Sequence, residues 1–403
     1  MKCRLCQGKV KKFLDLGKTA LPEEFRLQKD LGKPINKYPL NLVYCLNCNH
    51  VQLGFVPPID IIYKKNYFYD YSLTKSGRTH WHKLSKKIYK DYKPDKNDLV
   101  VDIGSNTGTL LSQFRLLGLR ILGIDPAKRL VEIARKNNIP TLSDYFTPQV
   151  AKKIVKNYGQ AKIITCTNTF DHVENLDKFM EAISLLLRKD GSLVIEVPYL
   201  FAMIQTLNHI FYHQQIDYLM VKPLVAFLAK FEMEITDLET IPLHGGSIRI
   251  FIHFKATKKP TKAVFNLIKQ EEVLFKNWSK VLKSFAKSVL RQKSNLQRFL
   301  KAIKEKNKQI AGIGASAKGI TLLNYCNIGM ETIDFITEKS PLKIGRFTPS
   351  GIPIVSDDHL AIQKPDYLLL LSWNFKMEII KNLKQYPMQE VKFILPIPKV
   401  TII

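Results

Sequence analysis

Short apolar runs alternate with helically spaced apolar positions along the chain, most clearly between residues 99 and 198. The run 99–103 (LVVDI) is strand-like, the glycine turn 104–108 (GSNTG) follows it, and a helical pattern begins at Thr109. Further strand-like runs lie at 119–125, 161–170 and 192–198, with a helical stretch at 174–191. Strands that alternate with helices predict a parallel, doubly wound α/β sheet.

A second unit of the same kind occurs near the C-terminus. The segment 308–323 (KQIAGIGASAKGITLL) combines a strand, a glycine loop and a helix start, and a lysine-rich helical stretch precedes it. A chain of 403 residues is too long for one ordinary core. We therefore expect three parts: an N-terminal zinc-binding module (1–75), a central α/β domain (76–258), and a helical segment with a second Rossmann-like α/β domain (259–403).

Composition places the chain among soluble globular proteins. Apolar residues make up 45% and charged residues 24%. No apolar run approaches the ~18 residues of a membrane span, and the start, MKCRLCQGKV, has no signal-peptide core. We expect a cytoplasmic protein with no membrane partner.

The formal net charge of +27 admits two interpretations. A basic surface suits nucleic acid, because phosphate contacts release counterions. It also suits a solvated lysine-rich face or an acidic small substrate. The lysines are densest in 258–308, where they read as outer helix faces, so we do not expect nucleic acid as the partner.

Four of the six cysteines form two CxxC pairs. Two such knuckles place four thiolates tetrahedrally around zinc, whereas disulfides are disfavoured in a cytoplasmic chain and one redox pair would not explain two copies. The 38 residues from 7 to 44 require an extra hairpin or helix between the knuckles. Four sulfur ligands leave no open position, so this zinc is expected to be structural. The predicted ligands are Cys3, Cys6, Cys45 and Cys48.

The first glycine turn indicates a nucleotide cofactor. Asp125 ends the second strand, where a carboxylate accepts hydrogen bonds from ribose hydroxyls. The middle glycine of a dinucleotide loop is absent, and Asn106, which tolerates positive φ, stands near its place. The pattern D-x-G-x-x-x-G resembles motif I of class I S-adenosylmethionine-dependent methyltransferases. That resemblance implies a cofactor site made of Asp102, Gly104, Ser105, Asn106, Gly108, Asp125 and Asn168.

Nearly the whole chain resembles the zinc-containing sugar C-methyltransferases of deoxysugar pathways. The segments that carry the resemblance occur in order: YPLNLVYCLNCNHVQL, YFYDYSLTKS, GSNTG, IEVPYL, YHQQIDY, LHGGSIRIF, GIGASAKGITLLNYC, KSPLKIGRFTPSGIPI, LLLLSWNF and FILPIP. In that family the substrate is a nucleotide-activated sugar, methylated on a carbon next to its 4-keto group. The resemblance implies S-adenosylmethionine and structural Zn²⁺ as cofactors.

The resemblance assigns the C-terminal half to the nucleotide-sugar. Glycines in the second loop let the backbone approach a ligand, and a helix start beside Lys318 suits a diphosphate. A tight packing turn is the alternative for these glycines. The substrate-binding candidates are Gly314, Ser316, Lys318, Gly319 and Arg346.

A carbon next to a ketone must lose a proton before it attacks the methyl sulfonium, so a general base is needed. The family has a Tyr-His-Glu-His run, whose second histidine is the proposed base. Here the run is Tyr212-His213-Gln214-Gln215. An amide cannot remove a carbon-bound proton. The site is therefore present, but Gln215 replaces its expected base.

Three explanations stay open. His213 or another histidine (His172, His209 or His244) serves as the base; a tyrosine, Tyr212 or Tyr69, serves with a lowered pKa; or the enzyme methylates oxygen, nitrogen or an already acidic carbon. The catalytic candidates are Tyr212, His213, Gln215, Tyr69 and His244.

The sequence favours a methyltransferase that acts on a nucleotide-sugar, as a monomer or homodimer, with C-methylation preferred over O- or N-methylation. A zinc-headed RNA methyltransferase accounts for the charge but not for the GIGASAKG half. A non-catalytic relative that keeps both ligand folds is the third class.

Overall fold

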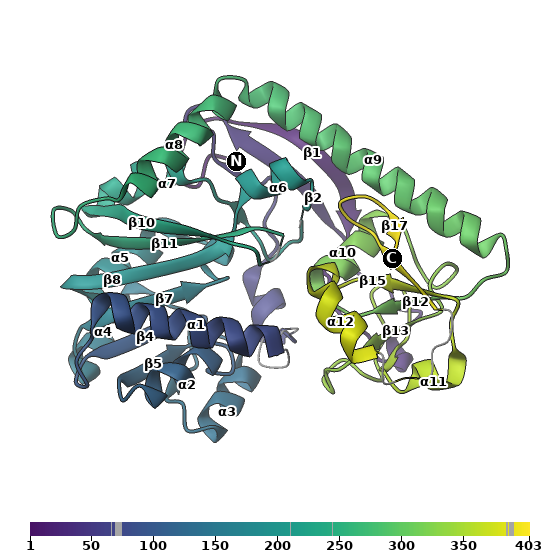
Figure 1. Ribbon diagram of the computed structural model, residues 1–403, viewed down its shortest axis with the longest axis horizontal. Coiled ribbons are helices and arrows are strands. Elements are labelled where there is room, and N and C mark those ends of the chain that lie inside the picture. The colour runs from purple at the N-terminus through teal and green to yellow at the C-terminus, as the bar shows by residue number, and fades with distance from the viewer. Residues whose placement is uncertain (66, 69–74, 210, 244, 384–385, 387–390) are drawn as a thin grey trace.

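The computed structural model describes residues 1–65, 67–68, 75–209, 211–243, 245–383, 386 and 391–403. Tyr69 and His244, two of the catalytic candidates, lie outside the described residues. Figure 1 shows two α/β units side by side, with one long helix running across both. Within the described ranges, no helix is both long and apolar enough to cross a membrane.

The N-terminal module is built on an antiparallel sheet. β1 (Val10–Thr19) pairs with β2 (Tyr38–Cys45), which pairs with β3 (Val51–Leu53). β3 pairs in turn with β9 (Asp217–Tyr218), a strand from much later in the chain. The β1–β2 hairpin fills the interval between the two cysteine pairs, as expected. Because β9 follows the YHQQ run, the module is hydrogen-bonded directly to that run's segment.

The central unit is a doubly wound sheet with strand order β10-β11-β8-β7-β4-β5-β6. β4, β5, β6, β7 and β8 are parallel, and β11 and β10 add an antiparallel edge. The sequential elements are α1 (Lys75–Tyr92), β4 (Leu99–Ile103), α2 (Thr109–Leu116), β5 (Arg120–Ile124), α3 (Lys128–Lys136), β6 (Thr141–Leu142), α4 (Pro148–Tyr158), β7 (Ala161–Thr167), α5 (Leu176–Leu186), β8 (Leu187–Pro198), α6 (Leu200–Thr206), α7 (Val221–Leu228), β10 (Met233–Ile241) and β11 (Ser247–Phe254).

Both faces of this sheet are covered. Every residue of β4 is buried, as a parallel strand between two helix layers must be. Val100 packs into the cluster that contains Trp81 of α1 and Phe114 of α2. Its neighbour Val101 packs into the larger core that contains Ile183 of α5. Successive side chains of β4 thus point to opposite faces of the sheet, and each face packs against its own helix layer.

The predicted helix at 174–191 was too long. α5 ends at Leu186, and β8 begins at Leu187 and pairs with Ala161 of β7. The register then shifts before Ile163 pairs with Ser192. Gly191 lies at this irregularity, where a Cβ would come within 2.9 Å of the backbone oxygen of Lys162. The polar LRKDG stretch therefore forms a bulged strand start and not a last helical turn.

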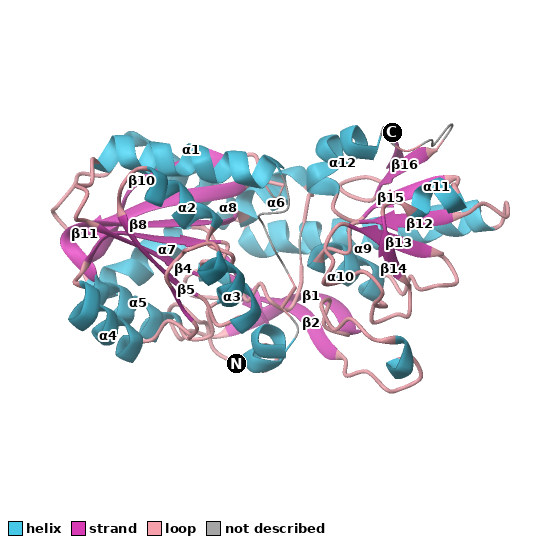
Figure 2. Ribbon diagram, turned by 90° about the horizontal axis from the view of Figure 1, so that it is seen from below, coloured by secondary structure: helices cyan, strands magenta, loops and turns pink. Residues whose placement is uncertain are grey.

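The C-terminal unit has strand order β14-β13-β12-β15-β16-β17 and is parallel except for β17. Its elements are α8 (Lys262–Phe275), α9 (Trp278–Lys304), β12 (Ile310–Ile313), α10 (Ala317–Tyr325), β13 (Phe335–Glu338), β14 (Ile354–Ser356), α11 (His359–Gln363), β15 (Tyr367–Leu370), α12 (Lys376–Leu383), β16 (Lys392–Leu395) and β17 (Thr401–Ile402). The expected second Rossmann-like unit is thus confirmed. Figures 1 and 2 show α9 spanning from the central unit to this one, and α9 contacts β1 on the way.

Candidate functional site

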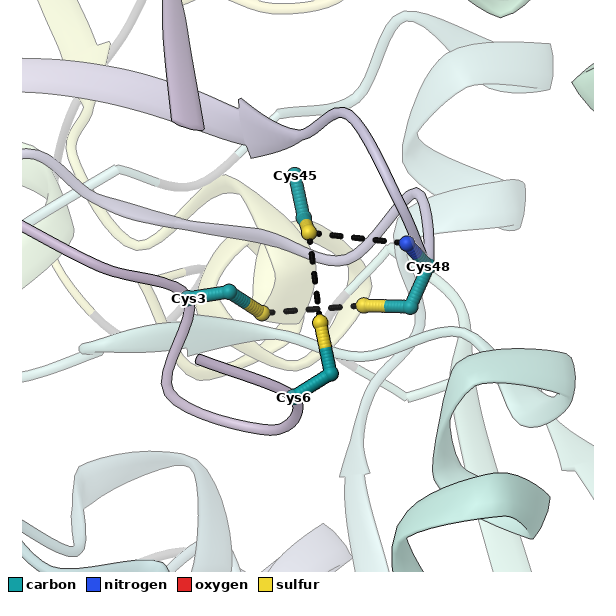
Figure 3. Close-up of side chains that lie close together, drawn as sticks. All are labelled: Cys3, Cys6, Cys45 and Cys48. Carbon is teal, nitrogen blue, oxygen red and sulfur yellow. Dashed lines mark hydrogen bonds between the residues drawn. The ribbon is translucent and has the colours of Figure 1, made fainter. Parts of the chain in front are cut away.

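The four paired cysteines lie together at the base of the N-terminal hairpin (Figure 3). The Sγ atoms of Cys3 and Cys48 are 3.6 Å apart, those of Cys6 and Cys45 are 3.4 Å apart, and all four lie within 4.8 Å of one another. Zinc–sulfur bonds of about 2.3 Å require tetrahedral edges of about 3.8 Å, so these residues fit a Zn²⁺ ion. The nearby His50 is not part of this cluster, and its Nε2 lies 2.8 Å from a carboxylate oxygen of Asp217.

The first glycine loop forms a tight turn between β4 and α2. Gly104 and Gly108 have φ of +74° and +78°, and Asn106 has φ of +52°. A Cβ on Gly104 would lie 2.1 Å from Thr169 Oγ1, so only glycine fits there. The buried Ser105 Oγ has no hydrogen-bond partner. A turn that exposes its backbone beside an unpartnered hydroxyl suits the polar groups of S-adenosylmethionine.

Two buried carboxyls flank this loop. Asp125 follows β5, and its Oδ2 accepts the N–H of Asn106 at 2.9 Å while its Oδ1 accepts the N–H of Ala127 at 2.8 Å. Burial raises the pKa of Asp125 to about 6. Burial also raises the pKa of Asp102 to about 7, although Thr165 donates a hydrogen bond to it at 2.6 Å. Hydroxyls of a bound ribose are the donors that would favour an ionised Asp125.

A cavity of about 430 Å³ lies where the N-terminal module and the two α/β units meet, within the usual size of a small-molecule site. Asn168, a cofactor candidate just past β7, lines its wall on the central side. Gly314 and Lys318 of the C-terminal unit line the opposite wall. The cavity therefore lies between Asn168 and the second glycine loop, and residues 104–108 of the first loop are not among its described lining.

The YHQQ run contributes alternate residues to this cavity. Tyr212 and Gln214 line it, and the Oε1 of Gln214 has no partner. His213 is buried with its Nε2 3.3 Å from the carbonyl oxygen of Tyr38, and His213 is not among the described residues that line the cavity. Gln215 is fully buried, and neither its amide nitrogen nor its amide oxygen has a partner. Burial lowers the pKa of His213 to about 4.

Among the described histidines, His172 is the one that lines the cavity. It ends the short 3-10 turn Phe170–His172 after β7 and lines the cavity wall. Its Nδ1 lies 3.0 Å from the phenol oxygen of Tyr63, and its Nε2 lies 3.4 Å from the phenol oxygen of Tyr212. Burial lowers the pKa of His172 to about 4, so the imidazole is neutral at pH 7. By contrast, His209 is buried against the Tyr325 hydroxyl at 3.0 Å.

Asp171 precedes His172 in the chain, and its carboxyl lies near the imidazole. Its Oδ2 is 3.7 Å from His172 Nε2, and neither carboxyl oxygen has a hydrogen-bond partner. Burial raises the pKa of Asp171 to about 8, so this carboxyl is mostly protonated at pH 7. The neighbouring Tyr63 is also buried, which raises its phenol pKa well above the usual value. Both groups keep their protons at pH 7, whereas the neutral imidazole of His172 beside them can accept one.

The second glycine loop holds its candidates in different environments. Ser316 caps α10, accepting the N–H of Gly319 at 3.3 Å and donating to Leu371 O at 2.9 Å. A Cβ on Gly319 would lie 2.5 Å from Leu371 O, so this glycine serves close packing. Arg346 is not among the described lining residues, but it stacks over Phe68, which is one of them, at 5.2 Å and donates to Leu342 O.

Lys318 points its amine into the cavity wall. The Nζ lies 4.8 Å from the ring centroid of Trp373 and 5.8 Å from that of Phe375. It is buried and has no hydrogen-bond partner. Burial lowers the pKa of Lys318 to about 7. A buried, unpaired amine at a helix start is prepared to receive an anionic group.

Four carboxyl residues of the described cavity lining were not identified from sequence: Glu23, Glu338, Asp357 and Glu378. Glu338 ends β13, and its Oε2 accepts the N–H of Ala315 in the second glycine loop at 3.0 Å. This repeats the relation of Asp125 to the first loop, so an acid at the second strand's end was the missed signal. Glu23 is 2% exposed, and its Oε1 has no partner. Burial raises the pKa of Glu23 to about 7, and no sequence pattern marks it.

Three family models match consecutive parts of the chain: a zinc binding domain at residues 3–63, a methyltransferase domain at 75–222 and a C-methyltransferase C-terminal domain at 242–398. Over 407 residues the chain is 30% identical to the C-methyltransferase NovU of Streptomyces niveus, covering 100% of this chain and 96% of that protein. The chain belongs to the C-methyltransferase family.

More distant similarities cover only parts of this C-methyltransferase. The ubiquinone biosynthesis O-methyltransferase of Pelagibacter ubique is 29% identical over 122 residues, which is 28% of this chain and 49% of that protein. A solved S-adenosylmethionine-dependent methyltransferase of Anabaena variabilis matches 43% of this chain and 84% of that chain, with 17% identity and a TM-score of 0.35.

Membership in this family confirms the resemblance drawn from the sequence. The C-methyltransferase depends on S-adenosylmethionine, and its four clustered cysteines hold a structural zinc ion. The C-terminal match extends through the second glycine loop, so the half of the chain that an RNA methyltransferase would leave unexplained belongs to this family.

Proposed function

We propose that the enzyme methylates a carbon next to the keto group of a nucleotide-activated sugar, with His172 as the general base. The observation that carries this proposal is the position of the neutral His172 imidazole in the cavity wall, between Tyr63 and Tyr212. Gln215 cannot act as the base, and it is buried away from the described cavity lining.

The cavity walls support a nucleotide-sugar as the substrate. On the C-terminal side, the helix start and the unpaired amine of Lys318 suit a diphosphate. Glu338 bears the same relation to its glycine loop as Asp125 bears to the first loop, which suits a ribose-type hydroxyl. On the module side, the unpartnered Oε1 of Glu23 is available to a hydroxyl or amino group of the sugar.

His172 is suited to remove the proton. If Nδ1 carries the ring hydrogen and donates it to the Tyr63 oxygen, Nε2 carries the lone pair, which faces the Tyr212 phenol at 3.4 Å until the substrate carbon takes that place. The carbon-bound proton moves to Nε2, and the electron pair of the broken C–H bond forms the enolate. The low pKa of His172 keeps the imidazole unprotonated at pH 7.

The enolate oxygen needs hydrogen-bond donors. Tyr212 and Gln214 line the cavity beside His172, and each has a group that donates: a phenol O–H and an amide N–H. Gln214 thus serves as a donor where a glutamate would repel the developing negative charge. S-adenosylmethionine, when bound, supplies an electrophilic methyl group. The remaining contribution of the chain is alignment, with Asn168 on the cofactor side of the cavity.

A substrate panel in heavy water tests the proposal. The enzyme and S-adenosylmethionine are incubated with 4-keto nucleotide-sugars and with their reduced counterparts, and product mass is read for methyl and deuterium. We expect methylation of a keto sugar, together with deuterium entering unmethylated keto sugar. Methylation of reduced sugars alone, with no exchange at carbon, would instead establish O- or N-transfer.

A further inference from the structure

Arg4, the residue after the first zinc ligand, crosses from the zinc knuckle into the central unit. Its Nε lies 3.0 Å from both carboxylate oxygens of Asp217, and its guanidinium also donates to the carbonyl oxygen of Val173. The Arg4 side chain is 14% exposed and that of Asp217 is fully buried. A hydrogen bond between two charged groups is stronger than one between neutral groups.

Asp217 contacts residues next to both zinc knuckles, Arg4 in the first and His50 after the second. His50, two residues after the last zinc ligand, places its Nε2 2.8 Å from Asp217 Oδ1. Asp217 also pairs with Gln52 in the β3–β9 ladder, and the Gln52 side chain accepts the backbone N–H of Arg4 at 2.8 Å. The zinc-bearing turns and β9 therefore form one continuous hydrogen-bonded unit.

This unit holds the two segments that carry the proposed catalytic groups. Val173, whose carbonyl oxygen accepts the hydrogen bond from Arg4, directly follows His172 in the chain. Ile216, between the YHQQ run and Asp217, donates its N–H to the carbonyl oxygen of Asp171 at 2.8 Å. The orientation of His172 and Tyr212 relative to each other thus depends on the same anchor.

We propose that the first zinc knuckle positions the catalytic wall, with Arg4 and Asp217 as positioning residues for His172 and Tyr212. This inference rests on the proposed function for its effect on catalysis. Zinc ligation of Cys3 and Cys6, on either side of Arg4, would hold the turn together with the buried side chain of Leu5. Removing Arg4 takes the guanidinium from a buried carboxylate that keeps His50, and Asp217→Asn takes the anion from Arg4, so we expect the anchored segments to shift.

The test compares Arg4→Met and Asp217→Asn with Lys230→Met. Lys230 donates to the Leu5 carbonyl oxygen at 2.5 Å, so this control removes a different contact with the same knuckle. Zinc content, S-adenosylmethionine affinity, kcat, KM and the ring resonances of isotope-labelled His172 are measured on each full-length protein. Asp217→Asn keeps the side-chain shape and serves if Arg4→Met does not fold.

We expect the Arg4 and Asp217 variants to keep one zinc and an unchanged S-adenosylmethionine affinity. Their kcat should fall about 10- to 100-fold, with a smaller change in KM, since a displaced catalytic group costs up to about 100-fold. The His172 resonances should move in both variants and stay fixed in Lys230→Met. Unchanged His172 resonances would overturn the positioning role. If those resonances move while kcat stays constant, the assignment of His172 as base fails instead.

Discussion

The Nδ1 atom of His172 lies 3.0 Å from the phenol oxygen of Tyr63, on the side of the ring opposite Tyr212. A hydrogen bond at one ring nitrogen fixes which nitrogen carries the proton, and therefore which one is free as a base. Tyr63 comes from the N-terminal module and is buried. The module therefore takes part in setting the protonation pattern of the proposed active site.

Replacing Tyr63 with phenylalanine should lower kcat about fivefold, because one hydrogen bond of about 1 kcal/mol no longer favours the productive tautomer. KM and S-adenosylmethionine affinity should stay unchanged. Steady-state kinetics and calorimetry check this. Tyr386→Phe, which removes a phenol hydrogen bond to Asp358 elsewhere, is the matched control. Equal kcat in both variants would mean that Tyr63 does not act on His172.

Lys318→Met should weaken binding of a nucleoside diphosphate about 10- to 100-fold, the worth of about 1.5–3 kcal/mol for a charged hydrogen bond. The pKa of Lys318 is lowered to about 7 by burial, so binding to the wild type above pH 7 should also take up a proton. Calorimetry in buffers of different ionisation enthalpy measures both effects. Lys308→Met, which removes an exposed ion pair with Asp366 in the same unit, should change neither.

Glu23→Leu should raise KM for the sugar substrate about fivefold, because a substrate donor loses its acceptor, while S-adenosylmethionine affinity stays constant. Glu24 is half-buried and absent from the described cavity lining, so Glu24→Leu is the comparison. Initial rates against sugar concentration decide the outcome. If KM changed equally in both variants, Glu23 would not bind the sugar substrate.

His213 should act on stability rather than on catalysis. Its pKa falls from 6.5 to about 4 on burial, so the unfolded chain binds the proton more readily than the folded protein. The neutral, buried His213 therefore contributes its full share to the free energy of unfolding above pH 6.5. About 3 kcal/mol of that free energy is lost as pH falls toward 4. The destabilisation caused by His213→Asn should therefore shrink between pH 7 and pH 4. Urea unfolding at each pH measures it, and a constant difference would contradict the burial argument.

Features encoded by short local patterns could be predicted from the sequence. The two CxxC pairs predicted the cysteine cluster that fits zinc, and the GSNTG pattern predicted the tight turn that Asp125 holds, because each pattern carries its geometry within a few residues. The second glycine loop gave the second α/β unit for the same reason. The role of the GSNTG turn in cofactor binding stays a prediction. The domain boundaries, the cytoplasmic location and the monomeric or homodimeric state stay predictions.

Features that depend on long-range packing could not be predicted. The pairing of β9 with β3 decides that Gln214 faces the cavity while His213 contacts Tyr38. His172 was only one of several histidines until folding placed Tyr63 and Tyr212 on either side of it. Glu23 reaches the cavity from the hairpin module and belongs to no motif.

The most direct test of His172 as the base is deuterium exchange at the carbon next to the ketone, measured by mass spectrometry with S-adenosylmethionine omitted. His172→Gln and His213→Gln are compared with the wild type under the same conditions. The account predicts that His172→Gln loses exchange about 100-fold or more, as expected for general-base removal, and that His213→Gln retains it. Exchange that persists in His172→Gln but disappears in His213→Gln would contradict the account.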